Sequence, residues 1–162
     1  MTILGIDPGY AITGYAVIEY QGNHFKLINS GAIETKAGVP MPERLARIYD
    51  DTTMLINNYK PDAIAVEELF YHSNAKTVIG VAQGRGNVLT AAAKTNTNIY
   101  EYTPLQVKQA VVGYGRADKK QVQMMVKALL GLEKIPKLDD TTDAMAIAIC
   151  HAHSNKFAQK IT

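Results

Sequence analysis

The feature that most restricts the fold is a group of three extended segments at the start of the chain. They run from Thr2 to Asp7, from Thr13 to Tyr20 and from Phe25 to Ile33, with turn signals at Pro8-Gly9 and Gln21-Gly22-Asn23. Connections as short as these suit strands that lie antiparallel to their neighbours. We therefore expect the chain to begin with a three-stranded, antiparallel part of a sheet.

The rest of the chain alternates helical patterns with two further short strands. We first expect a helix from Pro42 that stops before Pro61, and then a strand from Asp62 to Glu67. A helix from its cap Asn74 to about Thr95 and a strand from Asn98 to Tyr102 follow. The last two elements are a helix after the capping box of Asp118 and Gln121 and a helix from about Asp139. Helices that alternate with strands in this way cover both faces of the sheet. The expected fold class is α/β, with a five-stranded mixed sheet and helices on both faces.

Three glycines, Gly80, Gly84 and Gly86, interrupt the helix that is expected to end near Thr95. In a helix interior each glycine costs roughly 1 kcal/mol relative to alanine. A glycine is useful there when another part of the chain must come close, because it has no side chain. We expect these three positions to permit the close approach of another backbone.

The length and composition are those of one globular domain, so we expect residues 1–162 to form a single domain. The 162 residues are 47% apolar and 20% charged, which excludes disordered and fibrous proteins. Cys150 is the only cysteine, so no internal disulfide can form and a reducing compartment is expected. No apolar run approaches the roughly 20 residues of a membrane span. We expect a cytoplasmic protein with no membrane partner.

The net charge of +2 is weak evidence for a nucleic-acid partner, but the distribution of charge says more. The segment 104–127 has a net charge of +4, from the cations Lys108, Arg116, Lys119, Lys120 and Lys127 against the single acid Asp118. A basic segment of this kind is typical of a surface that contacts phosphates, and equally of a solvated helix face. The charge alone leaves both interpretations open.

Carboxylates occur at the ends of two expected strands and at the start of the last expected helix. Asp7 and Glu67 each end an apolar strand, and the last helix opens with Asp139, Asp140 and Asp143. An ionised carboxylate at the buried end of a strand is costly unless donors or a metal ion pair with it. One acid in a first helical turn is explained by capping and by the helix dipole, and Asp139 is the natural cap. Spacing alone does not choose between Asp139 and Asp140.

Four carboxylates on three separate elements form a set of ligands that hard divalent cations prefer. Two Mg²⁺ ions about 3.5 to 4 Å apart can hold the attacking and leaving oxygens of an in-line displacement at phosphorus. Without metal, the same carboxylates would repel a phosphate. The pattern therefore favours metal-dependent hydrolysis of a phosphodiester.

Several motifs, in this order and spacing, resemble those of the RuvC family of Holliday junction resolvases. They are GIDPG with TGYAV, then AVEELF, AQGRG, QVKQAVVG, ADKKQVQ and DDTTDAMAIAICHAH. They cover nearly the whole chain, and their combination is far more specific than any one of them. The resemblance implies an RNase H-like fold and a structure-specific endodeoxyribonuclease that resolves Holliday junctions by paired symmetric nicks in DNA recombination and repair.

The resemblance also implies which carboxylates are catalytic and bind the metal. Carried over motif by motif, they are Asp7, Glu67, Asp140 and Asp143. The family's ligands imply two Mg²⁺ ions in each active site, with Mn²⁺ as a substitute. Glu68 is then peripheral, because adjacent residues on a strand face opposite sides.

Three further residues are implied to contact DNA. Phe70 matches an aromatic residue that stacks on an opened base, a contact worth roughly 1 to 3 kcal/mol per base. Burial of this phenylalanine under its own helix is the alternative. Lys108 and Lys119 match family lysines near the scissile phosphate. The neighbouring Tyr71 and His72 depart from the residues that relatives often carry, which leaves the local base preference open.

The implied partners are four-way junction DNA, a second copy of the chain and branch-migration helicase proteins of the RuvA and RuvB type. A two-fold symmetric homodimer suits a junction that needs two matched nicks. One alternative is an RNase H-like nuclease of the YqgF type, acting on ribosomal RNA precursors. Another is a non-catalytic junction-binding module. The QVKQAVVG and ADKKQVQ motifs favour the resolvase over the first, and the presence of all four acids argues against the second.

Overall fold

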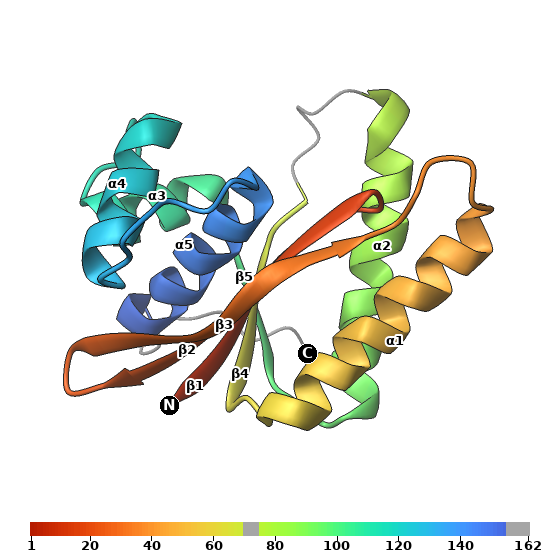
Figure 1. Cartoon of the computed structure of the whole chain (residues 1–162), viewed down its shortest axis with the longest axis horizontal. Coiled ribbons are helices and arrows are strands. Elements are labelled where there is room, and N and C mark those ends of the chain that lie inside the picture. The colour runs from red at the N-terminus through yellow and green to blue at the C-terminus, as the bar shows by residue number, and fades with distance from the viewer. Residues whose placement is uncertain (70–74, 155–162) are drawn as a thin grey trace.

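The computed structural model describes residues 1–69 and 75–154, and within them a single twisted sheet of five strands. The strands are β1 (Thr2–Asp7), β2 (Ile12–Gln21), β3 (His24–Glu34), β4 (Ala63–Glu67) and β5 (Ile99–Tyr102). Their order across the sheet is β3-β2-β1-β4-β5 (Figure 1). The first three strands pair antiparallel, whereas β4 and β5 add in parallel on the other side of β1. The expected mixed sheet with an antiparallel beginning is confirmed.

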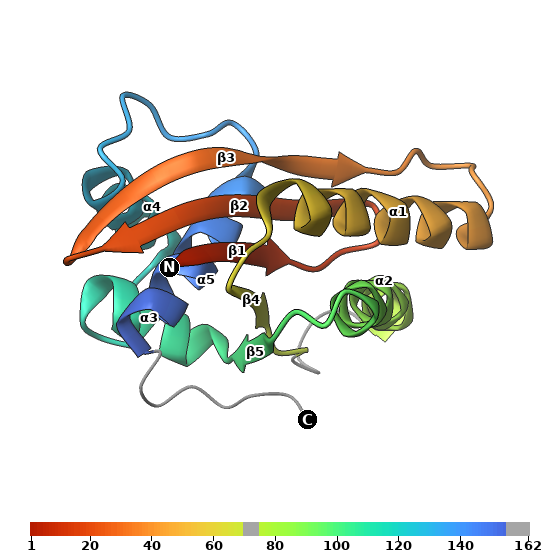
Figure 2. The ribbon, with the colours of Figure 1, turned by 90° about the horizontal axis from the view of Figure 1, so that it is seen from below.

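Five helices form two layers, one on each face of the sheet (Figures 1 and 2). One layer contains α1 (Met41–Tyr59) and α2 (Ala75–Lys94), and the other contains α3 (Pro104–Val112), α4 (Lys119–Leu129) and α5 (Asp139–Ser154). Each layer encloses its own apolar cluster against the sheet. This is the expected arrangement of an RNase H-like fold, with helices on both faces.

The alternation of side chains along β1 assigns its residues to the two layers. Leu4 and Ile6 belong to the cluster under α1 and α2, whereas Ile3 belongs to the cluster under α5. A Cβ atom at Gly5 would collide with the backbone of α5, so this glycine lets the helix lie directly on the strand. By the same period of two, Asp7 faces the α5 layer.

The helix α3 is absent from the expected elements. It begins with a capping box in which the Thr103 hydroxyl accepts from the Gln106 amide at 3.2 Å and the Gln106 side chain accepts from the Thr103 amide at 2.8 Å. Pro104 occupies the first helical position, where its fixed backbone angle is favourable. The same kind of box at Asp118 and Gln121 begins α4, as expected.

The three glycines of α2 differ in what they contact. A Cβ atom at Gly84 would lie 2.5 Å from the carbonyl oxygen of Gly9, so the turn after β1 approaches α2 there. At Gly80 the neighbour is the ring of Tyr10, at 2.7 Å, and Gly86 faces open space. The expected backbone approach is therefore correct for Gly84 and wrong for the other two. Gly80 and Gly84 are one helical turn apart on the covered face, whereas Gly86 lies off that face.

Among the helices of residues 1–69 and 75–154, none is long and apolar enough to cross a membrane. The expected cap Asn74 of α2 lies outside the described residues.

Candidate active site

Two carboxylates meet where two parallel strands end. β1 and β4 are adjacent and in register, with Ile6 opposite Val66, so the next residues along each strand are Asp7 and Glu67. Ala65 belongs to the apolar cluster under α5, and Glu67 is two residues further on the same face. Both acids therefore face the α5 layer, as the resemblance requires of a common site.

The first turn of α5 packs on the sheet beside Asp7 and Glu67. Gly14 on β2 is the cross-strand partner of Asp7. A Cβ atom at Gly14 would collide with the backbone carbonyl of Asp140, so only a glycine allows this approach. The Thr141 hydroxyl also donates to the Gly31 carbonyl on β3, at 3.2 Å. Sequence reasoning missed Gly14, which has no local pattern that marks it.

The carboxylates of the site repel one another electrostatically. Burial raises the pKa of Asp7 to about 8, and repulsion from Glu67, Asp143 and Asp140 contributes to the shift in that order. The pKa of Glu67 is raised by burial first and then by Asp143. Burial likewise raises the pKa of Asp143. The structure thus places all four predicted acids close enough to repel one another. A bound cation would reduce this repulsion.

The donor set fits a hard divalent cation, since it consists of carboxylate oxygens on a partly buried floor. In the part of the chain that the structure describes, no three carboxylate, imidazole or thiol groups are grouped closely enough to hold an ion as they stand. Binding would therefore require the side chains to turn toward one another. Their roles as ligands remain a prediction.

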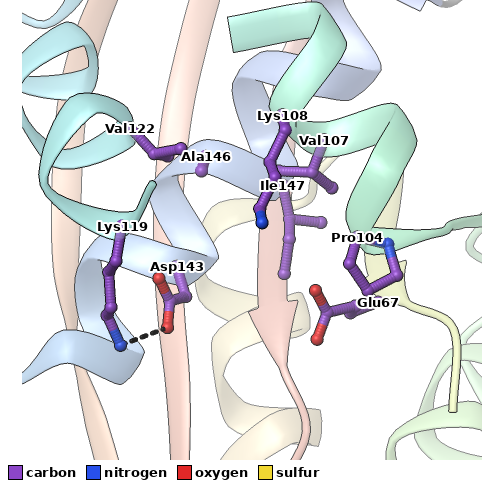
Figure 3. A pocket seen from close by; sticks show the side chains of 9 residues that line it. All are labelled: Glu67, Pro104, Val107, Lys108, Lys119, Val122, Asp143, Ala146 and Ile147. Atoms are coloured by element: carbon purple, nitrogen blue, oxygen red, sulfur yellow. Dashed lines mark hydrogen bonds and ion pairs between the residues drawn. The ribbon is translucent and has the colours of Figure 1, made fainter. Parts of the chain in front are cut away.

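A cavity of about 250 Å³ lies between α3, α4, α5 and the end of β4 (Figure 3). Its polar lining consists of Glu67, Lys108, Lys119 and Asp143, and its walls are apolar side chains of the three helices. In Figure 3 Lys119 lies beside Asp143, and the side chain of Lys108 points toward the space between Asp143 and Glu67. The structure therefore brings the two predicted phosphate-contacting lysines to the acids.

Lys119 forms ion pairs with two acids of α5. Its Nζ lies 3.1 Å from Asp139 Oδ2 and 3.3 Å from Asp143 Oδ2. Burial lowers the pKa of Lys119, but the hydrogen bond to Asp139 and the charge of Asp143 outweigh it, and the net shift is upward. The ammonium therefore remains charged at neutral pH and partly neutralises the acidic site.

The two ambiguous acids, Asp139 and Glu68, are each engaged by side chains of a neighbouring helix. Asp139 is the first residue of α5, and its contacts are with Lys119 and Gln123 of α4. Glu68 follows β4, and its charge acts on Arg85 of α2, which itself pairs with Glu101. These contacts agree with the choice of Asp140 and Glu67 as the site acids. Phe70, Tyr71 and His72 lie outside the described residues.

Comparison with known proteins shows which family this chain resembles. The family model described as crossover junction endodeoxyribonuclease RuvC matches residues 3–151. A protein of that name from Alkaliphilus oremlandii is 55% identical over 159 residues, which are 98% of this chain and 97% of the relative. The chain belongs to the RuvC family. The RuvC match includes all four candidate acids and both lysines of the cavity.

The RuvC likeness extends to the three-dimensional structure. A RuvC structure from Thermus thermophilus has a TM-score of 0.93 at 34% identity, over 99% of this chain and 100% of that one. A second structure, of T. thermophilus RuvC in complex with a Holliday junction substrate, has a TM-score of 0.95 at 34% identity and covers 99% of both chains. The RuvC fold is thus shared by the described residues, 1–69 and 75–154.

Proposed function

We propose that the protein is a structure-specific endodeoxyribonuclease that resolves Holliday junctions by paired symmetric nicks. The observation that carries this proposal is the meeting of four carboxylates from β1, β4 and α5 beside a cavity lined by two lysines. The names of the relatives, and the junction bound to the T. thermophilus structure, agree with this substrate.

In the proposed reaction, Asp7, Glu67, Asp140 and Asp143 would hold two Mg²⁺ ions, for which Mn²⁺ could substitute. When bound, the ions supply a water of lowered pKa and stabilise the charge on the leaving oxygen. The apolar side chains of the three helices that wall the cavity lower the local dielectric constant and strengthen electrostatic contacts beside them.

The two lysines of the cavity attract and orient the phosphate. Lys108 extends from α3 and Lys119 from α4, on separate elements that border the cavity (Figure 3). A phosphate between them gains two positive neighbours, which offset its repulsion by the acids. Phe70, just after β4, stays in the proposal as the residue that stacks on an opened base.

The proposed assembly follows from the substrate. A four-way junction has two-fold symmetry, and a homodimer with the same symmetry presents two sites for two matched nicks. Branch-migration helicase proteins of the RuvA and RuvB type are the expected partners. A substrate made of DNA agrees with a cytoplasmic location.

The test compares Mg²⁺-dependent cutting of a synthetic four-way junction, a linear duplex and an RNA hairpin. We expect paired symmetric nicks in the junction alone, and none with Asp7→Asn, which should still bind the junction. Cutting of the RNA hairpin in preference to the junction would support the YqgF type. Binding without cutting under any divalent cation would support a non-catalytic module.

A further inference from the structure

Asp139 is the acid of the last helix that the proposed metal site does not use, yet each of its side-chain oxygens has a partner. Its Oδ2 lies 3.1 Å from Lys119 Nζ, and its Oδ1 accepts a hydrogen bond from Gln123 Nε2 at 3.0 Å. Both partners come from α4, so these contacts join the start of α5 to the neighbouring helix. Because Gln123 takes one oxygen, the other is left facing the lysine.

The Lys119 ammonium is shared between two acids that differ in role. Besides Asp139, it contacts Asp143 Oδ2 at 3.3 Å, one helical turn further along α5. Lys119 is also the first residue of α4, whose start is fixed by the capping box of Asp118 and Gln121. A cation at a helix N-terminus is disfavoured by the helix dipole. The two carboxylates, and not the helix, therefore hold this ammonium at the cavity.

A divalent cation that binds Asp143 would compete with Lys119 for this carboxylate. A metal ion and an ammonium on the same carboxylate are like charges a few ångströms apart, and they repel each other strongly in a partly buried site. The cation therefore weakens the contact between Lys119 and Asp143. Asp139, one turn back and already in contact, is the acceptor that remains.

We propose that Asp139 is a positioning residue that keeps Lys119 at the mouth of the cavity after a divalent cation has taken Asp143. The inference rests on the proposed function, because it requires a cation at Asp143 and a phosphate for Lys119 to meet. Without Asp139 the lysine has two alternatives. It stays on Asp143 and competes with the cation, or it leaves for solvent and no longer meets the phosphate.

The test is a double-mutant cycle on the full chain, with Asp139→Asn, Lys119→Met and the double variant. Mg²⁺ affinity is measured without DNA by calorimetric titration, and cleavage by single-turnover kinetics on a four-way junction at saturating Mg²⁺. The matched control is Asp51→Asn, which removes a carboxylate from an i,i+4 pair with Arg47 on α1, away from the cavity.

Asp139→Asn should weaken Mg²⁺ binding about two- to fivefold, the range for an ion pair of partly exposed groups. Lys119→Met should strengthen it, and in that background Asp139→Asn should have a markedly smaller effect, since no lysine remains to compete. At saturating Mg²⁺, Asp139→Asn should slow cleavage roughly tenfold by misplacing the lysine. The double variant should be no slower than Lys119→Met, and Asp139→Glu should recover part of the rate.

Equal effects of Asp139→Asn on Mg²⁺ affinity with and without Lys119 would overturn the inference, as would an unchanged cleavage rate. A merely structural role would lower the melting temperature without producing this coupling. Failure of the proposed function is recognised separately. In that case the wild type would not cut the junction. It would also bind no Mg²⁺, or would bind it in a way that Asp143→Asn leaves unchanged.

Discussion

Replacement of Asp7 by asparagine should stabilise the metal-free protein at pH 8 while abolishing metal-dependent cleavage. Asparagine has nearly the shape of aspartic acid but no charge to bury. The end of β1 holds a carboxyl that is partly buried and surrounded by three other acids. Removal of that charge relieves the repulsion, whereas loss of a proposed metal ligand should disable the site.

The size of the effect follows from the shift in pKa. Folding raises the pKa of Asp7 from 3.8 to about 8. Below about pH 4 the carboxyl is protonated in both the folded and the unfolded chain, and it costs nothing. As the pH rises from about 4 to about 8, the unfolded chain loses this proton first, and the folded state is destabilised by up to about 5 kcal/mol.

The assay is urea denaturation followed by circular dichroism, in EDTA, at several values between about pH 5 and pH 8. The free energy of unfolding of the wild type should fall as the pH rises, and that of Asp7→Asn should fall less. Asp50→Asn, an exposed carboxylate on α1, is the control and should follow the wild type.

Mg²⁺ should narrow this difference in stability. A ligand at 100 times its dissociation constant stabilises the folded state by about 2.7 kcal/mol, and this gain requires the Asp7 carboxylate. Wild type should therefore be stabilised by Mg²⁺ at pH 8 and Asp7→Asn should not. If the wild type loses no stability between pH 5 and pH 8 in EDTA, or loses as much as Asp7→Asn, the reasoning is refuted.

Four other changes probe the elements that hold the site. Lys108→Ala should slow single-turnover cleavage about 100-fold, as loss of a transition-state stabiliser does, and normal turnover with a lowered melting temperature would show a structural role instead. Gly14→Ala forces a methyl group against the Asp140 carbonyl and should cost about 1 to 3 kcal/mol in urea denaturation; an unchanged midpoint would contradict the close approach. Thr103→Ala removes the cap of α3 and should cost about 1 kcal/mol, while Thr103→Ser should recover most of it in thermal unfolding. Phe70→Ala should slow the cutting of intact junctions more than of nicked ones, because only intact junctions must be strained open; equal slowing on both would count against stacking.

The sequence predicted those parts of the fold whose causes are local. The three extended segments and the short turns between them predict an antiparallel start. The apolar run from Ile3 to Ile6 places Asp7 at the end of a buried strand. The capping box of Asp118 and Gln121 marked the start of α4 because its two hydrogen bonds join residues only three apart.

The helix α3 could have been found from a similar signal. Thr103, Pro104 and Gln106 form a capping box with proline at the first position, but only Val107 and Val111 of this short helix are buried. Two apolar residues produce too little periodicity for a helix to be recognised by its pattern. The capping box is therefore the stronger signal for this helix.

The remaining parts of the site depend on contacts between distant segments. A glycine is required at position 14 only because Asp140, far along the chain, packs against it. Asp139 and Asp140 have the same chemistry in the sequence, and the contacts of Asp139 with both Lys119 and Gln123 of another helix distinguish it. Spacing along one helix carries no information about such partners. The family motifs selected Asp140, and its role as a ligand, like the single domain of residues 1–162, stays a prediction.

The burial of α5 has a consequence for how the enzyme loses activity. Every residue of this helix from Ala144 to Ala152 is buried, so the element that carries Asp140 and Asp143 also forms the centre of one core. A site on a surface loop can open and reform while the core stays intact. Here the acids of α5 should separate from those of the strands only when the whole chain melts. Loss of cleavage should therefore coincide with loss of helical structure along a denaturation curve, which leaves no half-folded form able to cut DNA at random.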